Sequence, residues 1–469
     1  MSHQAKKNLI SLDGTLMIKN NVLIVLVISS VVFLRVLFDA INQIEIHYEE
    51  AQYWVWSQNL SLSYLSKGPF IASAISVSNI IFGQTYLGLK FFSYLALIGT
   101  LIFLTLTSKR LTKDESNFTN GLLVSAFSPA LFILGGVAST DIILFFFWSL
   151  ALYAYVSFYK DRDERWFYVI ALSVGLGTLT KLSMVLLPLS ILVYFLFSDL
   201  RKYFFSAHLY LAALVAIILC SPILIWNAQN DWVSISHEIG HLVSAVPSRN
   251  PEILLLTLFF TIPSAIFLIY KETRFRFLSK RFNFLLYPVL VMVIFFVIKS
   301  FSGKIQPNWS IPVFLTLIPI FSCILDGQKR KILLPSFILV GSIFMLSNKD
   351  ISSRFLPYDP LHPTRGWNET FHNLIQNESY SILVSNDYKL LSSLAYFKNE
   401  PEKLHLISNK NTRLSHYNLW NRMKRPSDNI LYVTYSNNQI IDDKLDCTLV
   451  RDVDIYTRKQ LTLYNCTSK

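Results

Sequence analysis

The chain has 469 residues, of which 52% are hydrophobic and only 15% charged, and its formal net charge is +12. A water-soluble domain carries about 25% charged residues, so this composition excludes an ordinary soluble protein and indicates an integral membrane protein. The excess positive charge lies in loops between apolar runs, which argues against a nucleic-acid partner and favours contact with membrane lipids.

Apolar runs that are long enough to cross a bilayer follow one another through residues 1–347. The first run lacks a small-residue cleavage site, so we expect it to remain as a membrane helix. The sequence predicts a polytopic α-helical membrane domain with about eleven transmembrane helices, at residues 21–39, 86–107, 118–137, 142–159, 166–180, 182–198, 207–227, 252–270, 283–300, 311–325 and 332–347.

The loops between these runs differ in charge. If the N-terminus is cytoplasmic, the loops on the inner side hold 19 Lys and Arg residues and those on the outer side hold five. This asymmetry follows the positive-inside rule. It predicts a multi-pass protein with a cytoplasmic N-terminus, and an odd number of spans then places the C-terminus outside.

Residues 348–469 have the mixed composition of a soluble domain. The segments SILVS and NILYVTYS have the residue types of strands, whereas DYKLLSSLAYFKN has the period of a helix. We therefore predict a small extracytoplasmic α/β domain over residues 348–469. It contains Cys447 and Cys466, and an oxidising compartment would permit a disulfide between them. Two cysteines alone leave this pairing open.

The first outer loop, within residues 40–85, is dense in ionisable and aromatic side chains. Adjacent carboxylates beside an anionic membrane surface suit a cationic or proton-transferring task, whereas an interfacial aromatic belt explains the rings alone. Both interpretations stay open on the residues themselves. The apolar stretch after residue 69 is short for a span, and we expect a helix lying at the interface. The ionisable residues and rings are Glu45, His47, Glu49, Glu50 and Lys67, with Tyr48, Tyr53, Trp54, Trp56 and Tyr64.

Further candidate residues fall on the same outer side. Asp141 and Lys181 each lie between two closely spaced apolar runs, and an ionisable residue at membrane depth is a functional-site hypothesis by default. The alternative for each is a snorkelling side chain. Four segments are thus predicted to bring acids, lysines and aromatic rings to one face. The last of them is a later outer loop with Lys304, Gln306, Asn308 and Trp309.

In these motifs the chain resembles the bacterial polyprenyl-phosphate-dependent glycosyltransferases of the GT-C type. This is the group related to protein O-mannosyltransferases and to the lipid A aminoarabinose transferase. The family's first outer loop reads like HYDEAYYWLWSQ…KPP, and this chain has HYEEAQYWVWSQ…KGP. The resemblance covers nearly the whole chain, because later landmarks match in order: STDIILFFFWSLALY, GLGTLTKLSMVLLP, PILIWNAQNDWVS, PNWSIPVFL and NDYKLLSSLAYF.

The resemblance implies a GT-C fold and a hexosyl or pentosyl transfer at the periplasmic face of the bacterial inner membrane. The donor would be a sugar on an undecaprenyl-phosphate-type lipid, and a direct displacement would invert the anomeric configuration. The family's catalytic acids fall on Glu49, Glu50 and Asp141, with Glu49 as the first-choice general base. Its lysines fall on Lys67 and Lys181, which would neutralise the departing lipid phosphate.

Aromatic side chains would complete the pocket that the resemblance implies. Tyr53, Trp54 and Trp309 would stack on the sugar or wall the cavity. Glu49 stands where the family usually has Asp, and misplacing a reacting group by about 1 Å can cost roughly 100-fold in rate. Either the pocket has adjusted to the longer side chain of Glu49, or Glu50 or Asp141 contributes more to catalysis. Gly68 stands where the family often has Pro.

The resemblance leaves the acceptor open. Lipid A of the lipopolysaccharide, or another envelope glycan, is favoured, and transfer to a protein Ser or Thr is the alternative. The resemblance implies no definite cofactor; a divalent metal at His237 or His241 stays open, as does a hydrogen bond from either histidine to phosphate. A transporter is a third class of function, but it would place ionisable residues near the middle of the membrane, whereas these cluster at one face.

The sequence HEIGHL at residues 237–242 fits the zinc-protease signature H-E-x-x-H. In such a site His237 and His241 would bind one metal and Glu238 would activate water. The motif lies on the outer side, whereas Asp326, the tempting third ligand, lies three spans later on the inner side, across about 30 Å of hydrocarbon. Its polar flanks predict an interfacial loop. A membrane metalloprotease is therefore ranked below the glycosyltransferase.

Overall fold

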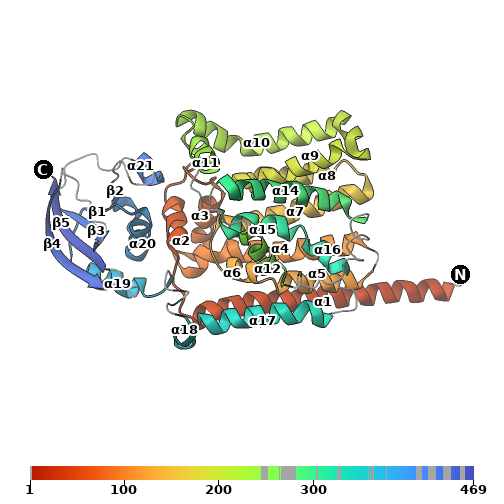
Figure 1. Ribbon diagram of the computed structural model, residues 1–469, viewed down its shortest axis with the longest axis horizontal. Helices are drawn as coiled ribbons and strands as arrows, with labels where there is room; N and C mark the ends of the chain where they lie inside the picture. Colours follow the sequence, from red (N-terminus) through yellow and green to blue (C-terminus); the bar gives the residue numbers. More distant parts are fainter. Residues whose placement is uncertain are drawn as a thin grey trace.

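The computed structural model is a helical bundle with a five-stranded sheet at one end, opposite the N-terminus (Figure 1). This is the polytopic helical fold with a small C-terminal α/β domain that the sequence predicts. The structure describes residues 3–468 except 113, 244–251, 264, 266–280, 303–304, 325–328, 357–358, 360, 362–363, 377, 408–414, 421–428, 437–444 and 455–459.

Five helices in the described residues are long and apolar enough to cross a membrane. Helix α7 has 78% of its apolar window buried, whereas α1 and α10 have only 17%. A helix that is apolar all round must face either a protein core or lipid, so α7 lies at the centre of the bundle and α1 and α10 face the bilayer. The five are α1 (His3–Ile41, apolar from Asn20), α4 (Tyr86–Leu111), α7 (Thr140–Asp161), α10 (Ala207–Gln229) and α14 (Asn283–Ser302).

Two of the expected spans are bent rather than straight. Helices α5 (Ser116–Ala126) and α6 (Pro129–Gly135) meet at 56°, because Pro129 cannot continue the first helix but is well placed to begin the second. The segment formed by η1 (Leu182–Val185) and α9 (Leu186–Leu196) meets η2 (Asp199–Phe205) at 111°. If each bent pair is one span, the described residues hold up to seven.

Shorter apolar helices occupy the remaining expected spans. The run at residues 311–325 is two helices, and Pro319 lies in the first turn of the second, where proline is tolerated. A single straight helix over 311–325 is therefore wrong, and the expected total of eleven stays a prediction. The short helices are α8 (Trp166–Thr178), α12 (Glu252–Thr261), α15 (Pro307–Leu315), α16 (Ile318–Ile324) and α17 (Lys329–Ser347).

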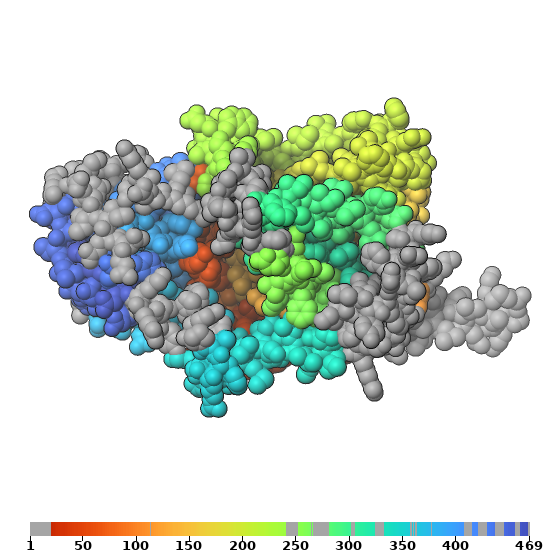
Figure 2. Space-filling model, in the orientation of Figure 1, coloured from red at the N-terminus to blue at the C-terminus, as the bar shows by residue number. Residues whose placement is uncertain are grey.

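Four helices lie at the end of the bundle that faces the sheet (Figure 1). They are α2 (Tyr48–Ser57), α3 (Phe70–Phe82), α11 (Val233–Val243) and α18 (Lys349–Phe355). Helix α3 is the one expected after residue 69, and its 13 residues are too few to span a bilayer. In the space-filling view the orange segment of α2 and α3 lies between the blue external domain and the green helices (Figure 2).

The external domain is built on a mixed sheet with strand order β2-β1-β3-β5-β4. The expected strands and helix are confirmed as β1, β3 and α20. Strand β1 pairs in parallel with β2 and β3, and β5 pairs antiparallel with β3 and β4. The elements are α19 (Trp367–Leu374), β1 (Ile382–Ser385), α20 (Tyr388–Lys398), η5 (Pro401–Lys403), β2 (Leu404–Leu406), α21 (His416–Trp420), β3 (Ile430–Tyr435), β4 (Leu445–Asp454) and β5 (Gln460–Ser468).

The external domain is fastened to the outer loop by buried contacts. The Nδ1 atom of His416, which is 3% exposed, accepts a hydrogen bond of 3.2 Å from the backbone N–H of Leu65. Glu45 accepts one of 2.6 Å from the N–H of Trp367. Because buried polar groups strongly require partners, these bonds fix the orientation of the domain over the loop.

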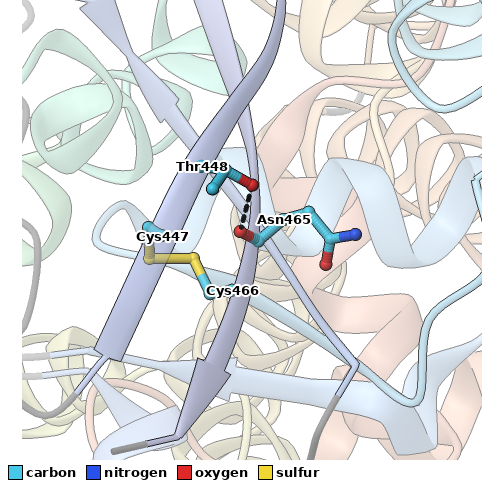
Figure 3. Close-up of a disulfide and its surroundings, with 4 residues drawn as sticks. All are labelled: Cys447, Thr448, Asn465 and Cys466. Carbon is cyan, nitrogen blue, oxygen red and sulfur yellow. Dashed lines mark hydrogen bonds between the residues drawn. A yellow bond between two sulfur atoms is a disulfide. The ribbon is translucent and has the colours of Figure 1, made fainter.

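Strands β4 and β5 carry the one cross-link among the described cysteines. Cys447 and Cys466 are directly opposed in the antiparallel ladder and form a disulfide. Figure 3 shows this bond beside the hydrogen bond from the Thr448 hydroxyl to the Asn465 carbonyl. The pairing that the sequence left open is therefore present.

We expect Cys447→Ser to destabilise the external domain by about 3 kcal/mol. The disulfide closes a segment with a sequence separation of 19, and a loop of that size restricts the unfolded chain by roughly this amount. Guanidinium unfolding monitored by proteolysis of the domain would measure the loss. Cys220→Ser, at a free cysteine of α10, is the control and should leave the domain unchanged.

Candidate active site at the domain-facing end

Helix α2 begins at a capping box that places two carboxylates in its first turn. His47 is the N-cap, and its Nδ1 atom accepts a hydrogen bond from the Glu49 N–H at 3.4 Å. In return, the Glu50 carboxylate accepts one from the His47 N–H at 3.0 Å. Acids in the first turn also complement the helix dipole. The local sequence therefore fixes both carboxylates at the start of α2.

These adjacent carboxylates face in different directions. Glu50 is 1% exposed, and its Oε1 atom accepts a hydrogen bond of 2.7 Å from the Ala138 N–H and lies 3.4 Å from the Lys90 ammonium. Glu49 is exposed at the surface of the helix. Successive helix residues point about 100° apart, so one acid anchors α2 while its neighbour is open to a substrate.

The anchor of Glu50 belongs to a larger buried network that joins three helices. Lys90 of α4 donates to the Gly136 carbonyl at 2.7 Å and lies 3.8 Å from the Asp39 carboxylate of α1. Asp39 also pairs with Arg35 and accepts a 2.6 Å hydrogen bond from the Tyr86 hydroxyl. Charges buried this deeply are stable only when paired, so the network fixes α1, α2 and α4 relative to one another.

A second cluster forms where α7 begins. The Asp141 carboxylate, 7% exposed, pairs with the Lys181 ammonium at 2.6 Å and accepts a hydrogen bond from the Asn308 amide at 2.8 Å. Lys181 precedes η1, and Asn308 lies in the first turn of α15. The Asp141 carboxylate thus binds two other expected site residues, Lys181 and Asn308, which come from distant parts of the chain.

Lys67 approaches this cluster from the outer loop. Among the described residues no carboxylate forms an ion pair with it. Burial lowers the pKa of Lys67, and the charge of Lys181 lowers it further. The pKa of Lys67 is raised by three carboxylates, those of Asp141, Glu238 and Glu49. Lys67 is therefore a partly buried cation that has acids around it but no committed partner.

The loop around Lys67 is held close to the end of α8. A Cβ atom on Gly68 would come within 2.0 Å of the Leu179 carbonyl oxygen, and the Phe70 N–H donates to that oxygen at 3.1 Å. No side chain fits there. This explains why glycine replaces the proline that is common at this point in the resembling family, and it brings Lys67 towards Lys181.

Tyr53 lies within electrostatic range of both Glu49 and Asp141. It is 3% exposed, and this burial raises its pKa well above the usual value. The Glu49 and Asp141 carboxylates raise the pKa further. Its hydroxyl is therefore a neutral hydrogen-bonding group. Trp54 is 1% exposed and packs edge-on against Tyr396 of α20, with ring centroids 5.1 Å apart. The structure thus uses Trp54 to hold the external domain on α2.

Two expected site residues in the later outer loop can be placed. Gln306 precedes α15 and is exposed, and Trp309 lies in its first turn, partly buried against the bundle core. Lys304 lies outside the described residues. Asn308 is the member of this loop that contacts the cluster, through Asp141.

The HEIGHL segment is helical, so the expected loop is wrong. It lies in α11 (Val233–Val243), whose apolar positions recur at helical spacing. His237 is partly buried, and the side chain of His241 lies outside the description, as does Asp326. The carboxylate of Glu238 raises the pKa of Lys67, so α11 lies within electrostatic range of this lysine. In the described part of the chain no three His, Cys, Asp or Glu side chains gather closely enough to hold a metal.

A cavity of about 720 Å³ opens at this end of the bundle, and its lining includes Pro69 and Leu179, which lie two residues from Lys67 and Lys181, respectively, in the chain. The outer loop, the end of α8 and the end of α10 line it with mostly apolar side chains. Its lining consists of Leu60, Ser61, Leu62, Pro69, Ser73, Leu179, Pro222, Trp226, Gln229 and Asn230.

Some residues at this end were missed by sequence reasoning. Arg35, Asp39 and Lys90 are charges within expected membrane spans, and that position is itself a signal of function or pairing. Glu238 was considered only as part of a protease motif. Lys389 of the external domain, which contacts α2, has no signal in composition or spacing.

Comparisons with known proteins agree with this architecture. Residues 66–226, about a third of the chain, match the family described as dolichyl-phosphate-mannose-protein mannosyltransferase. A structure of ArnT from Cupriavidus metallidurans bound to undecaprenyl phosphate superposes with a TM-score of 0.68 at 14% identity, covering 94% of this chain and 97% of that one. The chain therefore has the fold of ArnT. This confirms the resemblance predicted from the sequence.

Two other GT-C comparisons extend the likeness. The lipid A galacturonosyltransferase RgtD of Rhizobium johnstonii is 34% identical over 203 residues, which is 41% of this chain and 41% of that protein. The chain thus matches less than half the length of this curated relative. The oligosaccharyltransferase of Archaeoglobus fulgidus shares the fold with a TM-score of 0.54 at 13% identity, over 82% of this chain and 64% of that one.

We expect Glu50→Ala to destabilise the protein by about 3–5 kcal/mol, since it leaves Lys90 and the Ala138 N–H without their buried partner. Glu49→Gln should change stability by no more than about 0.5 kcal/mol, because the side chain is exposed. Unfolding in mixed detergent micelles would measure both. Equal losses from the two variants would contradict the different roles assigned to these acids.

Proposed function

We propose that the chain is a GT-C glycosyltransferase that moves a sugar from a polyprenyl-phosphate lipid to an envelope acceptor. The observation that carries the proposal is an exposed carboxylate, Glu49, within electrostatic range of an uncommitted cation, Lys67, at the domain-facing end. The acid suits proton removal, and the cation suits an anionic leaving group. The membrane-embedded fold supports a donor that arrives within the bilayer.

In the proposed reaction an acceptor hydroxyl attacks the anomeric carbon of the donor. A new carbon–oxygen bond forms as the bond from that carbon to the phosphate oxygen breaks. Glu49 takes the acceptor proton, and the leaving phosphate keeps the electron pair. The phosphate thereby gains one negative charge, which Lys67 stabilises. Attack opposite the leaving group inverts the anomeric configuration.

Asp141 has a positioning role in this scheme. It holds Lys181 at 2.6 Å and Asn308 at 2.8 Å, so Lys181 is part of a neutralised pair rather than a full charge. Of the two lysines this leaves Lys67 as the stronger phosphate ligand. The 720 Å³ cavity at this end has a mostly apolar lining, which suits part of a lipid chain.

The acceptor that we favour is lipid A or another envelope glycan, because the relative RgtD is described as a lipid A galacturonosyltransferase. Transfer to a protein Ser or Thr is the second candidate, supported by the match to the protein mannosyltransferase family. A zinc protease has no such support, because none of the similar proteins reported above is described as a protease.

We further propose that the domain-facing end lies on the periplasmic side of the inner membrane. The Cys447–Cys466 disulfide supports an oxidising compartment for the external domain. Basic side chains such as Arg110, Arg162 and Arg201 lie at or beyond the far ends of their helices, as the positive-inside rule requires.

We expect Glu49→Gln and Asp141→Asn each to reduce transfer at least about 100-fold, as loss of a proton acceptor or of its supporting cluster commonly does. The test is a mass spectrum of lipid A and envelope glycans from cells that lack the gene and carry the wild type or a variant. The wild type should restore one glycosyl unit and the variants should not. Glu369→Gln, an exposed acid of α19, is the control; transfer by both site variants would contradict the assignment.

The rate of transfer should fall at alkaline pH as Lys67 loses its proton. Because burial lowers the pKa of Lys67, the catalytic cation is present below that pKa and lost as the pH rises through it, sooner than for an ordinary lysine. Lys67→Arg should move this limb of the pH–rate profile upward, since guanidinium stays charged. A limb that stays in place in this variant would exclude Lys67 as its origin.

A further inference from the structure

The external domain places its own helix against the proposed active site. Helix α20 follows β1 and is capped by Asp387, which accepts a 2.7 Å hydrogen bond from the Lys389 N–H. Figure 1 shows α20 between the sheet and α2. The start of α20 meets the start of α2, where Lys389 reaches Tyr48, and the end meets the middle of α2, where Tyr396 packs on Trp54.

The side chain of Lys389 therefore lies beside the first turn of α2. Its ammonium is 4.7 Å from the centroid of the Tyr48 ring, one residue before Glu49. Burial lowers the pKa of His47, whereas the carboxylates of Glu49 and Glu50 raise it. The charges of Lys389 and Lys90 lower this pKa further, which agrees with an ammonium close to the capping histidine. Lys389 is half-buried, so it is neither a distant surface charge nor part of the core.

Lys389 differs from most other lysines near the site in having no carboxylate partner. Lys90 is paired with Glu50 and Asp39, and Lys181 is paired with Asp141. In the described part of the chain no carboxylate forms an ion pair with Lys389, and the ring of Tyr48 occupies only one side of its ammonium. An ammonium has three N–H donors, so this group can still bind an anion.

We propose that Lys389 binds a second anionic group of the substrates, next to the reacting centre and apart from the lipid phosphate. Lys67, on the outer loop, takes the lipid phosphate, whereas Lys389 comes from the external domain and lies across the first turn of α2. The group is a carboxylate on the transferred sugar or a phosphate on the acceptor. This inference rests on the proposed function and assigns substrate selection to the external domain.

The chain provides a matched control on the same helix. Lys398 occupies the last turn of α20. Its charge lowers the pKa of Glu400, which forms an ion pair of 2.9 Å with Lys403. Lys398→Met removes the same charge from the same element at its other end. Lys389→Arg keeps the charge at the first end and tests whether charge, rather than lysine shape, is required.

The experiment measures binding by the full-length protein in detergent, using quenching of tryptophan fluorescence, so that no turnover is needed. One arm compares bisphosphorylated lipid A with its dephosphorylated form. The other compares polyprenyl-phosphate galacturonate with polyprenyl-phosphate galactose. We expect Lys389→Met to weaken binding of the member with the additional anionic group, in one pair, by about tenfold or more, as loss of a charge-assisted hydrogen bond does. The member of that pair that lacks this group should bind as before.

The arm that shows this selective loss identifies the source of the anion. Lys398→Met should match the wild type, and Lys389→Arg should recover most of the affinity. Equal affinities of Lys389→Met and the wild type for all four lipids would overturn the inference while leaving the proposed function intact. If the wild type binds none of them, the proposed function fails, and the inference that rests on it fails with it.

Discussion

The buried carboxylate of Glu50 is the contact on which the geometry of this site depends. It accepts hydrogen bonds from the Ala138 and His47 N–H groups and lies 3.4 Å from the Lys90 ammonium. Three segments therefore meet at one side chain: the start of α2, the start of α4 and the turn that leads into α7. Because α7 carries Asp141, the same contact sets where Glu49 stands relative to the Asp141 cluster.

Pairing divides the lysines at this end into two groups. Lys90 and Lys181 form ion pairs with carboxylates, and these pairs stabilise the fold around the site. Lys67 and Lys389 are not paired among the described residues, and one comes from the membrane bundle while the other comes from the external domain. An enzyme that handles anionic lipids needs cations that are preorganised but uncommitted. In the proposed reaction the site would supply one from each domain.

The sequence predicted the features that depend on local pattern. Apolar runs predicted the helical bundle, strand-like segments predicted β1 and β3, and the order of motifs predicted the GT-C fold. It did not predict the bend at Pro129 as a break in a span, because apolar composition continues through the bend. It placed both Glu49 and Glu50 among the catalytic acids, with Glu49 as the first choice, since adjacent letters do not reveal which carboxylate is buried.

Tertiary contacts account for what the sequence missed. Lys389 is more than 300 positions from Tyr48 in the chain, and only the docking of α20 brings them together. The helical state of HEIGHL and the effect of Glu238 on Lys67 likewise depend on where α11 packs.

The central claim is that binding of the lipid phosphate and proton removal belong to different residues, Lys67 and Glu49. The most direct test is the affinity of the purified protein for undecaprenyl phosphate, compared between Lys67→Met and Glu49→Gln. This account predicts that Lys67→Met weakens binding by about tenfold or more, whereas Glu49→Gln binds as tightly as the wild type. Unchanged binding in Lys67→Met, or an equal loss in Glu49→Gln, would contradict it.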